Sequence, residues 1–154
     1  MPSRIVRDPH QFDELVGLLS DVKLPLTISW VKGADRSDEQ NNLMWIWAGE
    51  VAEQMQDRGA DEVQAEWKLE IGVPIMRADD VEFRELYDMT IKPLPYELKI
   101  KAMRLPGFFP VTSKMKVRQM CRFMNLVEQR CAERGLQLTQ PPDDLAKYNA
   151  RYGG

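Results

Sequence analysis

The strongest helical pattern in the chain lies in residues 37–58. Apolar side chains recur there at spacings of three and four, so one stripe should face a core. Ser37 and Gln40 form a capping-box pattern at the start, and Gly59 ends the helix. The stripe consists of Leu43, Met44, Trp47, Val51 and Met55.

A second strong helix is predicted over residues 114–134. We expect Thr112 or Ser113 as its N-cap and Gly135 just after its end. Its buried face would hold Val117, Met120, Cys121, Met124, Val127 and Cys131. Weaker helical patterns span residues 10–20, 61–71, 80–89, 95–104 and 143–151.

Two short segments have the composition of strands. Ile5 and Val6 form one, and residues 26–31 alternate and contain β-branched side chains. Prolines punctuate residues 74–110, part of which fits a hairpin as well as helices. We therefore predict an α+β fold, mostly helical with a small β-sheet, in a single domain over residues 1–154.

Length and composition favour an ordinary globular protein. The chain has 154 residues, 44% of them hydrophobic. No apolar run approaches the roughly 20 residues of a membrane span, and the N-terminus lacks the apolar block of a signal peptide. We expect a cytoplasmic protein without a membrane segment.

The residues that usually carry catalysis or hold metals are sparse. Cys121 and Cys131 lie ten residues apart in one predicted helix, so at about 15 Å they cannot form a disulfide, and we expect both to be structural. His10 is the only histidine, and we expect it at the surface where a helix starts. Without a phosphate-binding loop or a nucleophile motif, we predict a protein that is not an enzyme and has no metal or cofactor.

One cluster of carboxylates leaves an alternative open. Asp79, Asp80, Glu82 and Glu85 could hold Mg²⁺ for phosphodiester cleavage, although adjacent aspartates at a helix start are usually caps. The alternative function is a metal-dependent, structure-specific nuclease on recombination intermediates.

Charge is distributed unevenly along the chain. The net charge is −3, but residues 92–134 hold ten basic side chains against three acidic ones, a local charge of +7 that leaves −10 for the rest. Lys114, Lys116, Arg118 and Arg122 crowd the start of the predicted 114–134 helix, where the helix dipole disfavours cations. This arrangement favours an anionic partner, though a solvated basic helix surface fits the charge alone equally well.

The start of the 37–58 helix offers further polar and aromatic groups. Arg36, Gln40 and Asn41 lie where free backbone N–H groups attract phosphate, although Gln40 could simply complete the capping box. Trp45 lies off the core stripe and faces elsewhere. Base stacking and a subunit contact both fit Trp45, so a protein-interaction module is a further alternative.

These two helices resemble those of the phage NinB (Orf) recombination family. Residues 36–41, Arg-Ser-Asp-Glu-Gln-Asn, followed by Trp45, are similar to the family's Arg-Ser-x-x-Gln-Asn-x-x-x-Trp signature. Residues 112–117, Thr-Ser-Lys-Met-Lys-Val, resemble its entry into the long C-terminal helix. The endings at residues 133–135 and 150–153 also fit, and the match covers roughly residues 26–58 and 110–153.

The resemblance implies a recombination accessory protein of phages or prophages. Such a protein binds single-stranded DNA without marked sequence preference and helps to load a recombinase. It also implies an intertwined homodimer and contact with the host single-strand-binding protein. By position, the family's DNA-contacting residues correspond to Gln40, Trp45 and Lys114. A homodimer would double the basic segment, which removes the objection raised by overall acidity.

Overall fold

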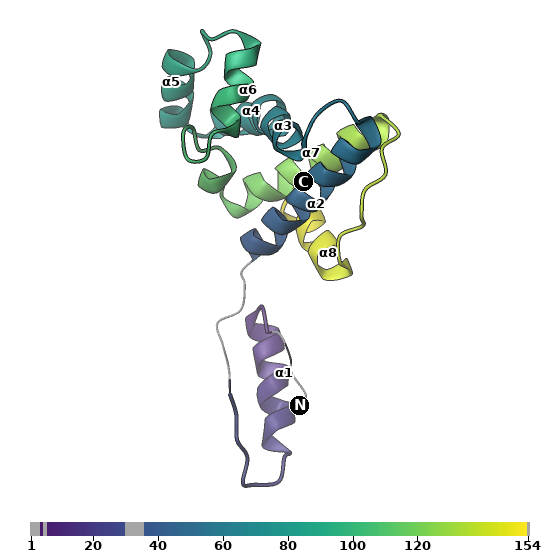
Figure 1. Cartoon of the computed structure of the whole chain (residues 1–154). Helices are drawn as coiled ribbons and strands as arrows, with labels where there is room; N and C mark the ends of the chain where they lie inside the picture. The colour runs from purple at the N-terminus through teal and green to yellow at the C-terminus, as the bar shows by residue number, and fades with distance from the viewer. Residues whose placement is uncertain (1–3, 5, 30–35, 154) are drawn as a thin grey trace. The chain divides into compact units, whose positions relative to one another are not determined.

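The computed structural model describes residues 4, 6–29 and 36–153. The chain divides into two compact units, Met1–Ala34 and Asp35–Gly154. The prediction of a single domain therefore stays a prediction. The first unit holds α1 (Pro9–Ser20). The second holds α2 (Arg36–Met55), α3 (Ala60–Trp67), the π-helical turn η1 (Lys68–Gly72), α4 (Val73–Asp79), α5 (Val81–Thr90), α6 (Tyr96–Arg104), the 3₁₀ turn η2 (Thr112–Lys114), α7 (Val117–Glu133) and α8 (Asp143–Tyr152) (Figure 1).

The described residues form an all-α structure, so the predicted α+β fold is wrong. Residues 26–29 have no secondary structure, and residues 74–110 contain helices rather than a hairpin. Alternation alone does not make a strand, because the backbone N–H and C=O groups also need a neighbouring strand. No described segment pairs with residues 26–29 in this way. Ile5 and residues 30–31 of the predicted strands lie outside the described residues.

Two hydrophobic clusters lie on opposite sides of the continuous stretch α3–η1–α4. One cluster joins this stretch to α2, α7 and α8, and Trp47, Phe123, Met44 and Met124 are its largest fully buried side chains. The other joins it to α5 and α6, where the ring of Phe109 packs edge-on against Phe83 at 5.4 Å between centroids. Burying a large apolar side chain contributes about 1.5–3 kcal/mol, so these clusters hold the helices in place.

The helix predicted to stop before Gly72 and Pro74 continues through both residues. The π-helical turn widens the backbone just before Pro74, which falls in the first turn of α4, where a missing N–H costs little. A Cβ atom on Gly72 would lie 2.8 Å from Val111 Cγ1 and 3.4 Å from Met115 Cε. The absence of a side chain at Gly72 therefore lets the segment that precedes α7 pack against η1.

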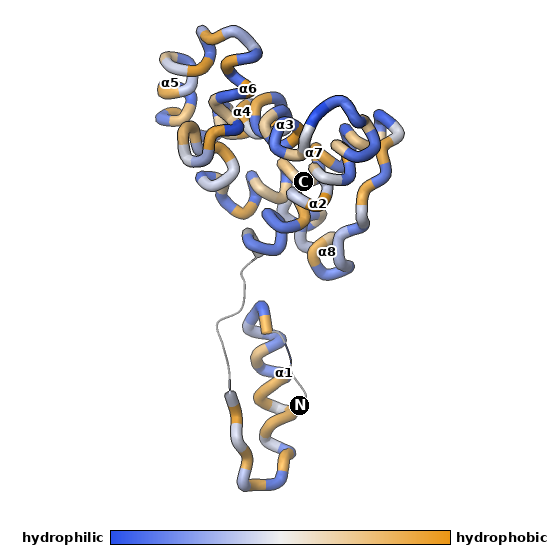
Figure 2. The backbone as a smooth tube through the Cα atoms, viewed as in Figure 1, coloured by the Kyte–Doolittle hydropathy of each residue, from blue (hydrophilic) through white to orange (hydrophobic). Residues whose placement is uncertain are grey.

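The described residues of unit Met1–Ala34 form one amphipathic helix with flanking loop residues, and none of these residues is buried. The Asp8 side chain caps α1 by accepting a hydrogen bond from the Gln11 backbone N–H at 2.8 Å. No residue of α1 is buried, and Phe12 and Val16 are about half exposed. Figure 2 shows the hydrophobic positions that recur along this helix.

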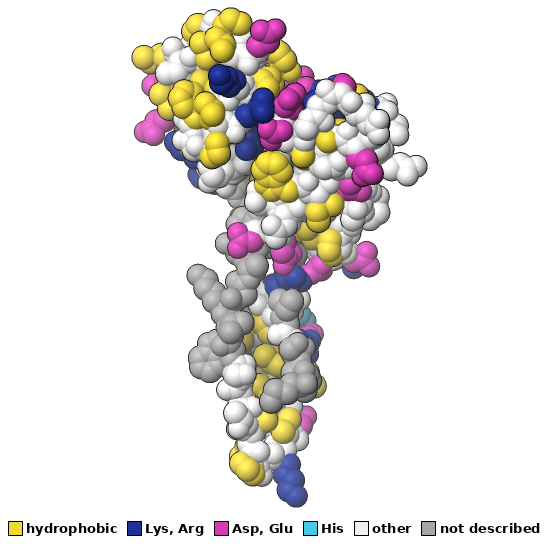
Figure 3. Space-filling model, in the orientation of Figure 1, with side chains coloured by type: hydrophobic (Ala, Val, Ile, Leu, Met, Phe, Trp, Pro, Cys, Tyr) yellow, Lys and Arg dark blue, Asp and Glu magenta, His cyan; other side chains and the backbone are white. Residues whose placement is uncertain are grey.

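Hydrophobic side chains are also exposed on the second unit. They gather over α5 and α6 on the face shown in Figure 3. The exposed apolar residues of this region are Val81, Leu86, Met89, Tyr96, Leu98, Leu105 and Phe108.

Among the helices that the structure describes, none combines the length and hydropathy needed to cross a membrane.

Candidate nucleic-acid interface

The structure brings the two sequence motifs together in one cleft. This cleft, the α2–α7 cleft, has a volume of about 690 Å³ and lies between the first turns of α2 and the segment that leads into α7. Its described lining residues are Asp38, Gln40, Asn41, Thr112, Ser113, Met115, Lys116, Val117, Met120 and Tyr148. Asn41 and Lys116, far apart in the sequence, therefore line the same cleft.

The start of α7 differs from the prediction. Thr112 and Ser113 are not its N-cap, because both lie in the separate turn η2 and the helix begins at Val117. Lys116 is the N-cap residue, and its backbone N–H donates to Gln119 Oε1 at 2.8 Å. Val117, expected to be buried, is 50% exposed. The extended residues before α7 thus leave Lys114 and Lys116 off the helix, on the surface.

The four predicted cations around the start of α7 are all exposed. Among the described residues, no carboxylate lies within 4.0 Å of Lys114, Lys116, Arg118 or Arg122. They do not form one row, however, because Lys116 lines the α2–α7 cleft while Arg122 lines a second groove. Arg118 and Arg122 are four residues apart, so they share a face of α7. The cations therefore flank the start of α7 on two sides.

The second groove, which we call the α4–α7 groove, is lined by both basic and acidic residues. It has a volume of about 600 Å³, and its floor includes Ile71, Ile75 and Leu126. Of the basic residues on its rim, Arg130 lies 3.6 Å from a Glu70 carboxylate oxygen, whereas Arg122 has no such partner among the described side chains. The groove therefore presents less uncompensated positive charge than its basic residues suggest.

Gln40 occupies a different position from the one predicted. Its side chain is 2% exposed, and its amide nitrogen donates to Asn149 Oδ1 at 2.8 Å and to Cys121 Sγ at 3.3 Å. The Gln40 amide N–H₂ is thus used inside the protein, and it links α2 to α7 and α8. Gln40 fixes the walls of the α2–α7 cleft, and we do not retain it as a DNA contact.

The other predicted residues of α2 lie at the surface where they are described. Asn41 is exposed and lines the α2–α7 cleft. Trp45 is 46% exposed and follows Asn41 by one turn on the same face of α2, beyond the lining of the cleft. Arg36 begins α2, and its side chain lies outside the described residues. Trp45 is therefore accessible, and both base stacking and a subunit contact remain open for it.

Tyr148, which none of the sequence motifs includes, also lines the cleft. It lies on α8, which a second set of contacts holds against α7. Asn125 Nδ2 donates to the Asn149 backbone oxygen at 3.0 Å, and a Cβ atom on Gly153 would lie 2.8 Å from the Cys121 backbone carbon. The spacing of Tyr148, Arg151 and Tyr152 on one short helix is the signal that could have marked this surface.

The described residues show few features of a hydrolytic site. No group of three or more His, Cys, Asp or Glu side chains in the described ranges could hold a metal ion. Asp80 caps α5 by accepting a hydrogen bond from the Phe83 backbone N–H, and Asp79 accepts one from Gln119 at 3.3 Å. Burial raises the pKa of the Cys131 thiol above its ordinary value of 9.0, which keeps the thiol protonated near neutral pH.

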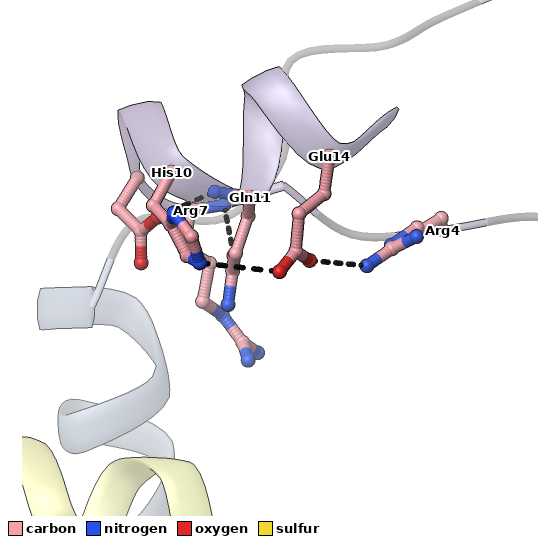
Figure 4. A network of polar contacts seen from close by, with 6 residues as sticks. Arg4, Arg7, His10, Gln11 and Glu14 are labelled. Atoms are coloured by element: carbon pink, nitrogen blue, oxygen red, sulfur yellow. Dashed lines mark hydrogen bonds and ion pairs between the residues drawn. The ribbon is translucent and has the colours of Figure 1, made fainter. Parts of the chain in front are cut away.

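The histidine belongs to a surface network on α1. As predicted, His10 lies in the first turn of a helix and is exposed. Its Nε2 atom lies 3.1 Å from one oxygen of Glu14, and Arg4 contacts the other oxygen at 3.0 Å (Figure 4). Side chains four residues apart on a helix commonly form such pairs, which contribute little to stability. The surface network therefore accounts for the position of His10 without a catalytic role.

Comparison with known proteins adds no assignment. No protein-family model, no curated protein and no solved structure matches the chain. The resemblance to the NinB family therefore stays a prediction from the motifs quoted above.

Proposed function

We propose that this protein binds single-stranded DNA through the α2–α7 cleft and the cations around the start of α7. The observation that supports this most is that Asn41 and Lys116, taken from two motifs far apart in the sequence, line one cleft. A cleft of about 690 Å³ is in the range of small-ligand sites, about 300–1,000 Å³, so it suits one or two nucleotides rather than a duplex.

The cations supply the electrostatic part of the proposed binding. Lysine and arginine side chains that neutralise phosphates release counterions, which makes affinity fall as salt is added. Lys114, Lys116 and Arg118 are exposed and have no carboxylate within 4.0 Å among the described residues, so no internal ion pair has to break before they meet a phosphate. Asn41 can both donate and accept hydrogen bonds, which suits contacts with more than one kind of base.

The wider biological role rests on the resemblance alone. We propose a recombination accessory protein of phage or prophage origin that acts as a homodimer and assists a recombinase, with the host single-strand-binding protein as a further partner. The exposed apolar side chains over α5 and α6 are compatible with a subunit contact, because patches of this kind often mark interfaces. Sedimentation equilibrium of the purified protein tests the dimer independently of DNA.

A binding assay with matched charge variants tests the proposed function. Fluorescence anisotropy with a labelled single-stranded oligonucleotide and with its duplex should show preference for the single strand and a steep loss of affinity with salt. Lys114→Glu should weaken binding to all sequences alike, while Lys101→Glu, the same charge change at an exposed position of α6, should leave affinity nearly unchanged. Binding that is insensitive to salt, or equal loss in both variants, would contradict the proposal.

Two further measurements separate the alternatives. Cleavage of branched DNA by the pure protein in the presence of Mg²⁺ would favour the nuclease instead. For Trp45, the fluorescence difference between the wild type and Trp45→Phe should respond to oligonucleotide if the indole stacks on a base. A response to protein dilution alone would place Trp45 in a subunit interface.

A further inference from the structure

Tyr148 is the one aromatic residue among the described residues that line the α2–α7 cleft. Its side chain is partly buried, so one part packs against the protein while the rest faces the cleft. Asn41 and Lys116 line the same cleft. An aromatic ring, an amide and an ammonium group thus meet in one cavity large enough for a nucleotide.

The ring of Tyr148 has an aromatic neighbour on its own helix. The ring of Tyr152 packs against it at 4.9 Å between centroids with an angle of 57° between planes, and the Arg151 guanidinium lies 5.4 Å from the Tyr152 centroid. The next residue, Asn149, is buried and receives the Gln40 hydrogen bond at 2.8 Å. A ring fixed in this way loses little conformational entropy when a flat ligand stacks on it.

We infer that Tyr148 is a stacking platform for a single nucleobase of the DNA strand, with the adjacent phosphate on Lys116. This inference rests on the proposed function and adds the part of the nucleotide that the cleft recognises. Bases present a π-face to aromatic side chains whatever their sequence, which suits a binder without marked sequence preference. Asn41, on the α2 side of the cleft, is placed to hydrogen-bond the edge of the stacked base.

Oligonucleotides with and without bases test the inference. The probes are a labelled oligothymidylate and the same chain in which every position is a stable abasic analogue, so that the phosphates remain. The wild type should bind the base-bearing strand about tenfold more tightly, because stacking contributes roughly 1–3 kcal/mol per base. Tyr148→Leu should lose this preference while keeping its affinity for the abasic strand, and Tyr148→Phe should retain it.

Lys116→Gln is the matched control. It should weaken binding to both strands by the same factor, because both carry the phosphates that Lys116 is proposed to meet. A Tyr148→Leu variant that keeps the full preference for bases, or loses affinity for both strands equally, overturns the role of Tyr148. Absence of any binding by the wild type would instead overturn the proposed function, so the two failures are distinguishable.

Photocrosslinking gives a result that does not depend on a folded variant. An oligonucleotide containing 5-iododeoxyuridine forms adducts with aromatic residues in contact with the base. Mass spectrometry of the irradiated wild-type complex should place the adduct on Tyr148. An adduct found on other aromatic residues, such as Trp45, and not on Tyr148 would overturn the inference.

Discussion

Two groups of basic residues differ in what surrounds them. On the α3–α6 side of the molecule, Arg77 lies 2.9 Å from Asp88 and Arg104 lies 2.8 Å from Asp61, each with two nitrogens donating to the carboxylate. Around the start of α7, Lys116 and its neighbours have no such partner among the described residues. The first group is already neutralised, and the second remains available to an external anion.

This difference shows how a charge count along the sequence can mislead. Arg104 and Arg130 contribute to the +7 of residues 92–134, yet both pair with acidic residues of segment 61–70, which the count leaves out. An exposed lysine without a partner is ordinary, so the absence of pairing alone would not mark a site. Four such cations lie within nine residues on two sides of the start of α7, and none of them has a carboxylate within 4.0 Å among the described residues.

The largest effect is expected when charge is removed from each of the two groups of basic residues. We expect Lys114→Gln, Lys116→Gln and Arg118→Gln together to lower affinity for single-stranded DNA at about 50 mM salt by at least about a hundredfold. Arg58 belongs with the paired arginines, because its guanidinium contacts the carboxylates of Asp57 and Glu66. The same charge change through Arg58→Gln, Arg77→Gln and Arg104→Gln should lower the melting temperature but leave affinity within about threefold. Anisotropy titrations and thermal melts check both. Equal losses of affinity would show that only net charge matters.

The next largest effect should separate Gln40 from Asn41. Gln40→Ala leaves the buried oxygen of Asn149 without its donor, so the free energy of unfolding should fall by about 1–3 kcal/mol. Asn41→Ala should leave the unfolding free energy nearly unchanged and weaken binding instead, because its side chain is exposed in the cleft. Urea denaturation of both variants measures the first quantity. A Gln40→Ala protein of full stability would contradict the role assigned to the buried network.

A smaller effect is expected in the α4–α7 groove. Glu70→Gln removes the carboxylate that lies 3.6 Å from Arg130 and leaves a second uncompensated cation beside Arg122. Affinity for single-stranded DNA should rise by roughly twofold to fivefold at low salt and converge with the wild type at high salt. Anisotropy at several salt concentrations checks this. Unchanged affinity would limit the binding surface to the other side of α7.

The smallest expected effect concerns the pairing of Arg77 with Asp88. Hydrogen bonds from Arg77 lower the pKa of the Asp88 carboxyl below its ordinary value of 3.8. Because the pKa of Asp88 is lower in the folded than in the unfolded state, the ionised carboxylate stabilises the folded state at pH values above the unfolded-state pKa. This stabilisation is lost as the pH falls below about 3.8. Arg77→Gln should therefore raise the pKa of Asp88, as NMR titration of the carboxyl carbon would show. An unchanged pKa would mean that the pair exerts no influence on Asp88.

Local patterns predicted most of the helices but not their ends. The apolar stripe around Trp47 predicts α2 correctly except for Met55 at its end, which is 39% exposed. Gly135, with φ of +71°, follows α7 as expected. The predicted start of α7 is wrong because the N-cap is Lys116, whose backbone N–H donates to Gln119 Oε1. Thr112 and Ser113 are common N-cap residues, and their presence favoured an earlier start. Similarly, α2 ends at Met55 rather than at residue 58, where Gln56 takes φ of 56°.

The candidate site was predicted less completely than the helices. The exposed cations and Asn41 came from local composition, and the structure places Asn41 and Lys116 together. The burial of Gln40 could not be predicted, because its partner, Asn149, lies 109 residues away. The spacing of Tyr148 and Tyr152 on α8 indicates an aromatic face, but which cleft that face borders depends on α2 and on the segment before α7, both far away in the sequence.

The amino-acid sequence alone determined where helices form, which of their faces are apolar and how densely cations gather near residue 114. These properties depend on neighbours within one or two helical turns, which the sequence displays directly. The tertiary structure decided that residues 26–29 have no strand partner, that Gln40 is buried, and which arginines pair with carboxylates. Each of these depends on a group distant in the chain, because hydrogen bonds and ion pairs act over a few ångströms of space whatever the separation in sequence.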